Sequence, residues 1–494
     1  MKIDLGTLTF GFPAAERDPD LHACFVFSET YKRLENREKT VILGNRGSGK
    51  SALFKQLAEN ERRNGTVVIQ LAPEDYAYEF LAQVLRSEAQ GSWQKHGAYA
   101  AAWKHLIYIT VMKHLIKQGC RFKKGAEARL YAYLRDNYEG TETNPIGMMV
   151  SFMKRLELLK VKVEGYETDL RVRKLKRLYT LEELEPFLAD IRDVCRTKRV
   201  IVLVDELDKG WDASEDAIAF VSGLFQAATS INATETNMNI YVSLRKELYD
   251  NIPALYDDAQ KVRDIIEYIE WDEPGLLELI GRRIARKVPE LENVSFDDRW
   301  NSIFSETLDY RRTNSFNYVV DRTLYRPREI IQFCNDITDK VKKSEVKEFS
   351  PFNYHQIAEA EHGYSESRLK DIASEFRFQY PGLLSIFETF RGMTYSMERD
   401  QLIDHLLKIL LGEIPIDADA MRWCESFDQE KLIMVLWQVG FLRALAVGGL
   451  KARRRSGSEY LGIHQISSLN LAAIPRFQIH PMFRAYLGMK EPKT

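Results

Sequence analysis

The fold is decided by residues 41–57, which read VILGNRGSGKSALFKQL. The apolar Val41–Leu43 is typical of a short buried strand. Gly44, Gly47 and Gly49 allow the next turn to point its backbone N–H groups inward, where side chains would obstruct a polyphosphate. Ser51–Leu57 is expected to open a helix whose positive N-terminal end faces the same point. The stretch therefore predicts a phosphate-binding loop between a strand and a helix.

The loop pattern G-x-x-x-x-G-K-S also predicts which residues bind ATP and Mg²⁺, the two expected cofactors. Lys50 is long enough to reach the β- and γ-phosphates, and the Ser51 hydroxyl is placed to ligate Mg²⁺. The alternative is a glycine-rich turn without a ligand, which the flanking strand and helix disfavour. The expected binding residues are Gly44, Asn45, Arg46, Gly47, Ser48, Gly49, Lys50, Ser51 and Ala52.

A second acidic motif follows the apolar run of residues 200–204. Five consecutive apolar residues, mostly β-branched, favour a strand buried on both faces of a parallel sheet. Asp205 and Glu206 come at its carboxyl end, where open α/β sheets bind ligands. We expect Asp205, at the end of a strand neighbouring the loop strand, to coordinate Mg²⁺ and Glu206 to activate the attacking water. The alternative is a solvated strand end.

The composition limits the class of protein. A chain of 494 residues is too long for one core, so several domains are expected. With 45% apolar residues, 29% charged residues and a net charge of −2, the chain is typical of a soluble protein without a strong overall field for nucleic acid. Its five cysteines are scattered, without a C-x-x-C pair, so neither a disulfide framework nor a zinc site is expected. We expect a cytoplasmic chain without a membrane span.

Further strands are expected at residues 66–71, 239–243 and 264–271, alternating with helices at 216–230 and 246–260. This alternation predicts an α/β P-loop NTPase core, with a parallel sheet and helices on both faces. The segment 76–196 has helical periodicity, with stretches such as 98–117 and 148–160, and is expected to be a large helical insertion in the core.

The remainder of the chain predicts a helical lid and a C-terminal winged-helix-like domain. Lid helices are expected at 275–288, 297–309, 316–324 and 327–343. The last part has expected helices at 398–411 and 429–441, then a basic tip and strand-like segments at 460–464 and 477–480. The expected division is 1–75 and 197–273 for the core, 76–196 for the insertion, 274–345 for the lid and 346–494 for the C-terminal domain.

Two basic stretches stand out in this near-neutral chain, Arg171–Arg177 and Lys451–Arg455. Both are candidates for contacts with a nucleic-acid backbone. The alternative, a solvated charged surface, is common for such runs. The apolar character of the 429–441 helix argues against a recognition helix that reads DNA bases and leaves protein docking open.

The order of elements, the lid and the winged-helix-like end resemble the origin-recognition and STAND branches of AAA+ ATPases. The loop GNRGSGKS, the run VDELDKGW at 204–211 and the HPMF at 480–483 resemble a group of bacterial P-loop ATPases often encoded among anti-phage defence genes. This resemblance implies a γ-phosphate sensor at Arg245, a finger reaching a neighbour's nucleotide at Arg263 and a second sensor at Arg328. For each arginine an ordinary salt bridge is the alternative.

The resemblance implies a Mg²⁺-dependent ATPase that acts as a nucleotide-driven switch. It would form a homo-oligomer on binding ATP and would work with a partner effector protein, such as a nuclease, in bacterial defence. One alternative is a DNA-binding motor or loader that uses the winged helix. Another is a scaffold that hydrolyses ATP so slowly that binding alone matters.

Overall fold

The structure is a computed structural model that describes most of the chain and divides into two compact units. The described residues are 3–71, 95–116, 125–138, 181, 184–208, 211, 213–250, 252, 263–310, 312–344, 349–447, 459–466 and 469–492. Unit 1 consists of Met1–Val26, Arg46–Gly49 and Glu270–Thr494, and unit 2 of Phe27–Asn45 and Lys50–Ile269.

Unit 2 is built on a five-stranded sheet in the order β2-β3-β4-β1-β5, in which every pairing is parallel. Its strands are β1 (Val41–Gly44), β2 (Val67–Leu71), β3 (Val200–Val204), β4 (Met238–Arg245) and β5 (Ile266–Tyr268). The expected strands and their parallel arrangement are confirmed. The fifth strand is shorter than the predicted 264–271, because only the part beside β1 is paired.

The strand order differs from the expectation in one respect that matters for the site. Asp205 was expected at the end of a strand neighbouring the loop strand, but β4 lies between β1 and β3. Gly44 at the end of β1 is paired with Arg245, and Val204 at the end of β3 is paired with Val242. Because neighbouring strands lie about 4.8 Å apart, the ends of β1 and β3 are separated by roughly 10 Å. Residues at the end of β4 can therefore contact both.

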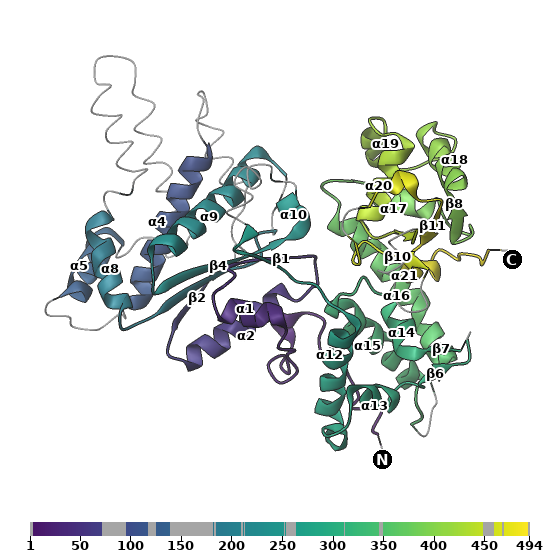
Figure 1. Cartoon of the computed structure of the whole chain (residues 1–494), viewed down its shortest axis with the longest axis horizontal. Coiled ribbons are helices and arrows are strands. Elements are labelled where there is room, and N and C mark those ends of the chain that lie inside the picture. The colour runs from purple at the N-terminus through teal and green to yellow at the C-terminus, as the bar shows by residue number, and fades with distance from the viewer. Residues whose placement is uncertain are drawn as a thin grey trace. The chain divides into compact units, whose positions relative to one another are not determined.

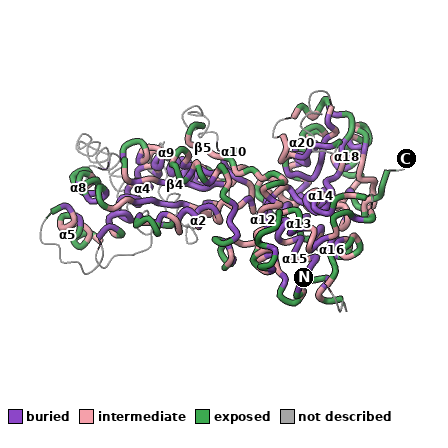
Figure 2. The backbone as a smooth tube through the Cα atoms, turned by 60° about the horizontal axis from the view of Figure 1, so that its bottom comes forward, coloured by how far each residue is buried: buried purple, intermediate pink, exposed green. Residues whose placement is uncertain are grey.

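Helices cover both faces of this sheet. In Figure 1, α1 and α2 lie on one face and α4 and α9 on the other. All five residues of β3 are buried, as expected for a strand covered on both sides, and Figure 2 shows the adjacent β4 as largely buried. The helices of unit 2 are α1 (Glu29–Glu35), α2 (Lys50–Arg63), α4 (Lys95–Leu115), α5 (Ala126–Tyr138), α8 (Glu185–Cys195), α9 (Glu215–Thr234) and α10 (Lys246–Asp250).

The described part of the predicted insertion is helical and packs on the core. Trp103 of α4 is fully buried, and its indole nitrogen donates to the carbonyl of Phe220 in α9 at 3.0 Å. Arg129 of α5 forms an ion pair with Asp190 of α8, and this pair links α5 to α8. The expected helix at 148–160 and the basic stretch Arg171–Arg177 lie outside the described residues.

Unit 1 contains the expected lid helices, with changes in their lengths. The predicted helix 327–343 is confirmed as α15, whereas the predicted helix 297–309 ends at Asn301. It ends because Phe304 forms a bridge with Phe352 instead of continuing the helix. The elements here are α12 (Glu273–Lys287), α13 (Phe296–Asn301), β6 (Thr307–Leu308), β7 (Thr313–Asn314), α14 (Ser315–Val320), α15 (Pro327–Lys343) and α16 (Tyr354–Glu375).

The C-terminal part of unit 1 forms a four-stranded antiparallel sheet in the order β10-β9-β11-β8. Helix α20 carries five buried residues, Leu432, Ile433, Val435, Leu436 and Trp437, so most of its apolar face is in the core. The basic tip Lys451–Arg455 lies outside the described residues. The elements are α17 (Leu383–Glu388), β8 (Ser396–Glu398), α18 (Arg399–Leu410), α19 (Ala418–Cys424), α20 (Gln429–Gln438), β9 (Leu442–Leu445), β10 (Tyr460–Leu461), β11 (Arg476–Ile479) and α21 (Pro481–Arg484).

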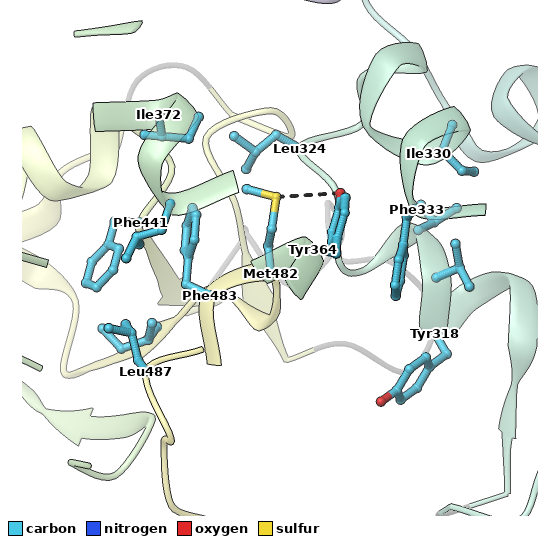
Figure 3. Close-up of a cluster of buried hydrophobic side chains, with 14 of the residues drawn as sticks. Tyr318, Leu324, Ile330, Phe333, Tyr364, Ile372, Phe441, Met482, Phe483 and Leu487 are labelled. Atoms are coloured by element: carbon cyan, nitrogen blue, oxygen red, sulfur yellow. Dashed lines mark hydrogen bonds between the residues drawn. The ribbon is translucent and has the colours of Figure 1, made fainter. Parts of the chain in front are cut away.

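One hydrophobic core joins the helices of unit 1 to its C-terminal sheet. Figure 3 shows Met482 of α21 between Phe483 and Tyr364, whose hydroxyl lies 3.9 Å from the Met482 sulfur. Phe333 stacks on Tyr364 with ring centroids 4.3 Å apart. The C-terminal segment at 480–483 therefore packs directly on α16. Among the described helices, none is both long and apolar enough to cross a membrane.

Candidate phosphate-binding site

The glycine-rich loop begins where β1 ends and finishes where α2 begins at Lys50. Gly47 and Gly49 have φ angles of +79° and +102°, a region that favours glycine because it has no Cβ. A Cβ added to Gly49 would have no atom within 4 Å, so the space beside it is open. The loop thus has the backbone conformation and the free space that a cradle for an anion needs.

Lys50 is held close to the loop. Its amino group donates to the carbonyl oxygens of Gly44 at 2.8 Å and Asn45 at 3.1 Å. Burial lowers the pKa of Lys50, while the carboxylates of Glu247 and Asp205 act in the opposite direction. A lysine whose charge is costly in this way gains from an additional anionic partner.

The tip of the loop, residues 46–49, contacts two other segments of unit 1 through its carbonyl groups. The Gly47 oxygen accepts from the backbone N–H of Arg328 at 3.4 Å. The Ser48 oxygen accepts from the indole nitrogen of Trp271 at 2.8 Å. Ser48 is also buried, and its hydroxyl has no partner among the described residues. Both carbonyls are therefore used within the protein.

Asp205 follows β3 and is fixed by two hydrogen bonds to one of its carboxylate oxygens. The Oδ1 atom accepts from the Ser243 hydroxyl and, at 2.8 Å, from the backbone N–H of Glu206. Ser243 lies on β4, the strand inserted between β1 and β3. The orientation of Asp205 is therefore set by the strand that separates it from the loop.

Glu206 adopts a left-handed backbone conformation, with φ of +62°. For a residue with a Cβ this conformation costs about 1–2 kcal/mol, and such strain is concentrated at functional sites. The position directly after Asp205, at the carboxyl edge of a parallel sheet, is where a ligand-binding residue is expected.

We expect the free energy of unfolding of Glu206→Gly to be higher than that of Glu206→Ala. Both variants lack the carboxylate, but only glycine adopts φ of +62° without the steric cost. After subtracting the greater chain entropy of glycine in the unfolded state, the difference should be about 0.5–1 kcal/mol. Urea unfolding of the two variants measures this difference, and an alanine variant that is as stable as the glycine variant would rule out the strain.

The three arginines singled out from the sequence have different surroundings. Arg245 forms ion pairs with Asp208 and, at 3.8 Å, with Glu247. Arg263 is exposed, just before β5. Arg328 begins α15 with its backbone against Gly47, and its Nε donates to the carbonyl of Pro13 at 3.4 Å. Of the three, Arg328 lies beside the loop tip.

A buried ionic network fixes the start of α15 and thereby the position of Arg328. Arg326 pairs with Glu375 at 2.8 Å and with Glu329 at 3.7 Å. The other Glu329 oxygen accepts from the backbone N–H of Leu324 at 2.6 Å. Burial raises the pKa of Glu329, which shows how far the network is removed from water. The start of α15, which contacts Gly47, is thus held by buried ion pairs and a hydrogen bond.

Two residues of the site were missed by the sequence reasoning, Ser243 and Trp271. Ser243 could have been noticed as a hydroxyl residue near the carboxyl end of a predicted strand. Trp271 has no local signal, because its partner Ser48 is distant in the sequence. The other predicted residues lie at the ends of the predicted strands: the loop and Lys50 follow β1, and Asp205 and Glu206 follow β3.

The parallel sheet, the glycine-rich loop after β1 and the carboxylates after β3 define an α/β protein with the arrangement of a P-loop core. Residues 274–373 match the model of the FunZ-associated C-terminal helical domain. A curated relative, the putative transposon gamma-delta 80.3 kDa protein of Escherichia coli (strain K12), is 21% identical over 491 residues. That match covers 97% of this chain and 66% of the relative, so the chain spans about two thirds of its length.

Among solved structures, the chain is weakly similar to the Aeropyrum pernix ORC2 protein, solved as ADPNP–ADP complexes. The TM-score is 0.35 at 10% identity, over 96% of this chain and 91% of the ORC2 chain.

Proposed function

We propose that this chain is a Mg²⁺-dependent ATPase that works as a nucleotide-driven switch. The observation that carries the proposal is the glycine-rich loop between β1 and α2, in which Gly47 and Gly49 have positive φ angles and which leads directly into Lys50. Asp205, held by hydrogen bonds from Ser243 and from the backbone N–H of Glu206, follows β3 in the same sheet. A loop of N–H groups, a lysine and a metal-binding carboxylate are the parts that a nucleoside triphosphate with Mg²⁺ requires.

The residues present fit such a ligand. The open space beside Gly49 and the unpartnered Ser48 hydroxyl leave room and a polar group for a phosphate. The lowered pKa of Lys50 indicates a cation that an anionic phosphate would stabilise. Ser51 and Asp205 would hold Mg²⁺, because hydroxyl and carboxylate oxygens are its preferred ligands.

Bound MgATP supplies a phosphoanhydride whose terminal phosphoryl group can be transferred to water. In the proposed mechanism, Lys50 and the loop N–H groups bind and orient the phosphates. Ser243 would hold the Asp205 carboxylate in one orientation, and Glu206 would accept the proton of the attacking water through its carboxylate.

The switch would act through Arg328. The N-terminus of α15 contacts Gly47. A change in the loop conformation on loss of the γ-phosphate would therefore move the start of this lid helix directly. A Cβ on Gly47 would lie 3.0 Å from the Arg328 Cβ, which shows how closely the two segments pack.

Steady-state phosphate release by the full chain tests the proposal. We expect ATP turnover that requires Mg²⁺ and is abolished by EDTA, because Asp205 and Ser51 can act only through the metal. Binding of ATP without detectable release would favour the nucleotide-dependent scaffold. Failure to bind any nucleoside triphosphate would refute the proposal.

Ser243→Ala should raise the Mg²⁺ concentration needed for half-maximal turnover by about 10–100-fold, as expected when a hydrogen bond that orients a metal ligand is removed. Ser222→Ala is a matched control, because this buried serine of α9 donates, within the part of the chain that the structure describes, only to the carbonyl of Ile218, at 2.8 Å. A magnesium titration of the ATPase rate measures the effect. The same magnesium dependence in both variants would exclude the role of Ser243.

The candidate partners of the chain are DNA, an effector protein and further copies of the chain itself. The name of the relative ties that protein to the transposon gamma-delta, which favours a DNA-handling ATPase as the second candidate function. The apolar face of α20 is buried in the core, which argues against a recognition helix that reads DNA bases and leaves protein docking open. We propose that a partner effector, in bacterial anti-phage defence, reads the switch, and that ATP promotes a homo-oligomer with the exposed Arg263 reaching the neighbouring site.

A further inference from the structure

Trp271 joins the loop tip to the first turn of α12. Its indole nitrogen donates to the Ser48 carbonyl at 2.8 Å. The next residue, Asp272, is the N-cap of α12, and its side chain accepts from the backbone N–H of Gly275 at 2.9 Å. All of these residues belong to unit 1.

The indole ring rests on Gly275. A Cβ at this position would lie 3.3 Å from Cε3 of Trp271, closer than an ordinary contact, and 3.0 Å from the Asp272 carboxylate. Glycine therefore lets the ring lie against the helix turn, and the turn limits how far the ring can move. Trp271 is also packed against the hydrophobic core of unit 1.

A fixed carbonyl determines the direction of the N–H group in the same peptide plane. In a trans peptide, the C=O of one residue and the N–H of the next point in opposite directions. No peptide bond described in the chain is cis. Holding the Ser48 oxygen toward Trp271 therefore turns the Gly49 N–H away from it, and the space beside Gly49 is open.

We infer that Trp271 is a positioning residue that presets the loop for a polyphosphate by holding the Ser48 carbonyl outward. This inference rests on the proposed function, because it concerns the same loop. The indole acts through the backbone and needs no contact with the ligand. Its support on Gly275 transmits the loop conformation to the start of α12, so that polyphosphate binding and the helix turn are coupled.

Trp271→Phe tests the inference, because it keeps an aromatic ring and removes only the N–H donor and part of the ring. Trp423→Phe is the matched control. Trp423 is also half-buried in unit 1, and its indole donates to the carbonyl of Pro381 at 2.9 Å. The two variants should lose similar thermal stability, so a difference in binding isolates the effect on the loop.

The probes are inorganic pyrophosphate and ADP, titrated calorimetrically into the full chain. We expect Trp271→Phe to weaken both by about fivefold, which equals about 1 kcal/mol, and Trp423→Phe to change neither by more than about twofold. A pyrophosphate-induced change in tryptophan emission should be present in the wild type and in Trp423→Phe and absent in Trp271→Phe. Gly275→Ala, which retains the indole but crowds it, should weaken pyrophosphate binding by about twofold to threefold.

Unchanged pyrophosphate affinity in Trp271→Phe would overturn the inference. Weaker binding of ADP alone would also overturn it, since that result would mean that the ring contacts the base. A wild-type chain that binds neither probe would instead refute the proposed function, and this outcome is visible before any variant is made.

Discussion

Lys50→Ala should abolish ATP turnover and weaken nucleotide binding. The amino group is the cation of the loop, and hydrogen bonds to charged groups contribute about 1.5–3 kcal/mol, so the dissociation constant should rise by roughly 10–150-fold. Turnover should fall by a further factor of about 10²–10³, because the developing charge on the phosphoryl oxygens loses its partner. Equilibrium titration and phosphate release measure the two effects separately.

Lys55→Ala is the control for this variant, because Lys55 lies on the same helix, α2, about one and a half turns farther along. It should bind and hydrolyse ATP like the wild type. A Lys50→Ala protein that turns over ATP at the parental rate would mean that the hydrolytic site is elsewhere.

Glu206→Gln should separate binding from hydrolysis. The amide has nearly the same shape as the carboxylate but cannot accept the proton of the attacking water, so ATP should bind with unchanged affinity while turnover falls by about 10²–10⁴. Glu215→Gln, which removes an exposed carboxylate at the start of α9, should leave both unchanged.

Two observations would count against the assignment of Glu206. One is parental turnover in Glu206→Gln, which would require a different base. The other is a parallel loss of ATP affinity, which would make Glu206 a binding residue and not the group that activates water.

Much of the core could be predicted because its signals are local. The apolar runs before Gly44 and Asp205 are contiguous, and a buried parallel strand needs little more than such a run. The loop glycines are likewise a local signal, because glycine favours positive φ angles, and Gly47 and Gly49 have them.

The errors and omissions arose where distant residues meet. The position of β4 between β1 and β3 depends on pairing among three segments, so the expectation of neighbouring strands was wrong. The predicted helix 297–309 was too long, because Phe304 pairs with Phe352 across the intervening chain. Ser243 and Trp271 were not predicted as site residues, because their partners Asp205 and Ser48 lie far away in the sequence.

The central claim is that the loop after β1 binds a nucleoside triphosphate through Lys50. The most direct test is calorimetric titration of a non-hydrolysable ATP analogue with Mg²⁺ into the full-length wild type and Lys50→Ala. We predict saturable binding at one site per chain for the wild type and a dissociation constant at least about tenfold higher for the variant. Equal affinity in the two proteins, or no saturable binding by the wild type at millimolar analogue, would contradict it.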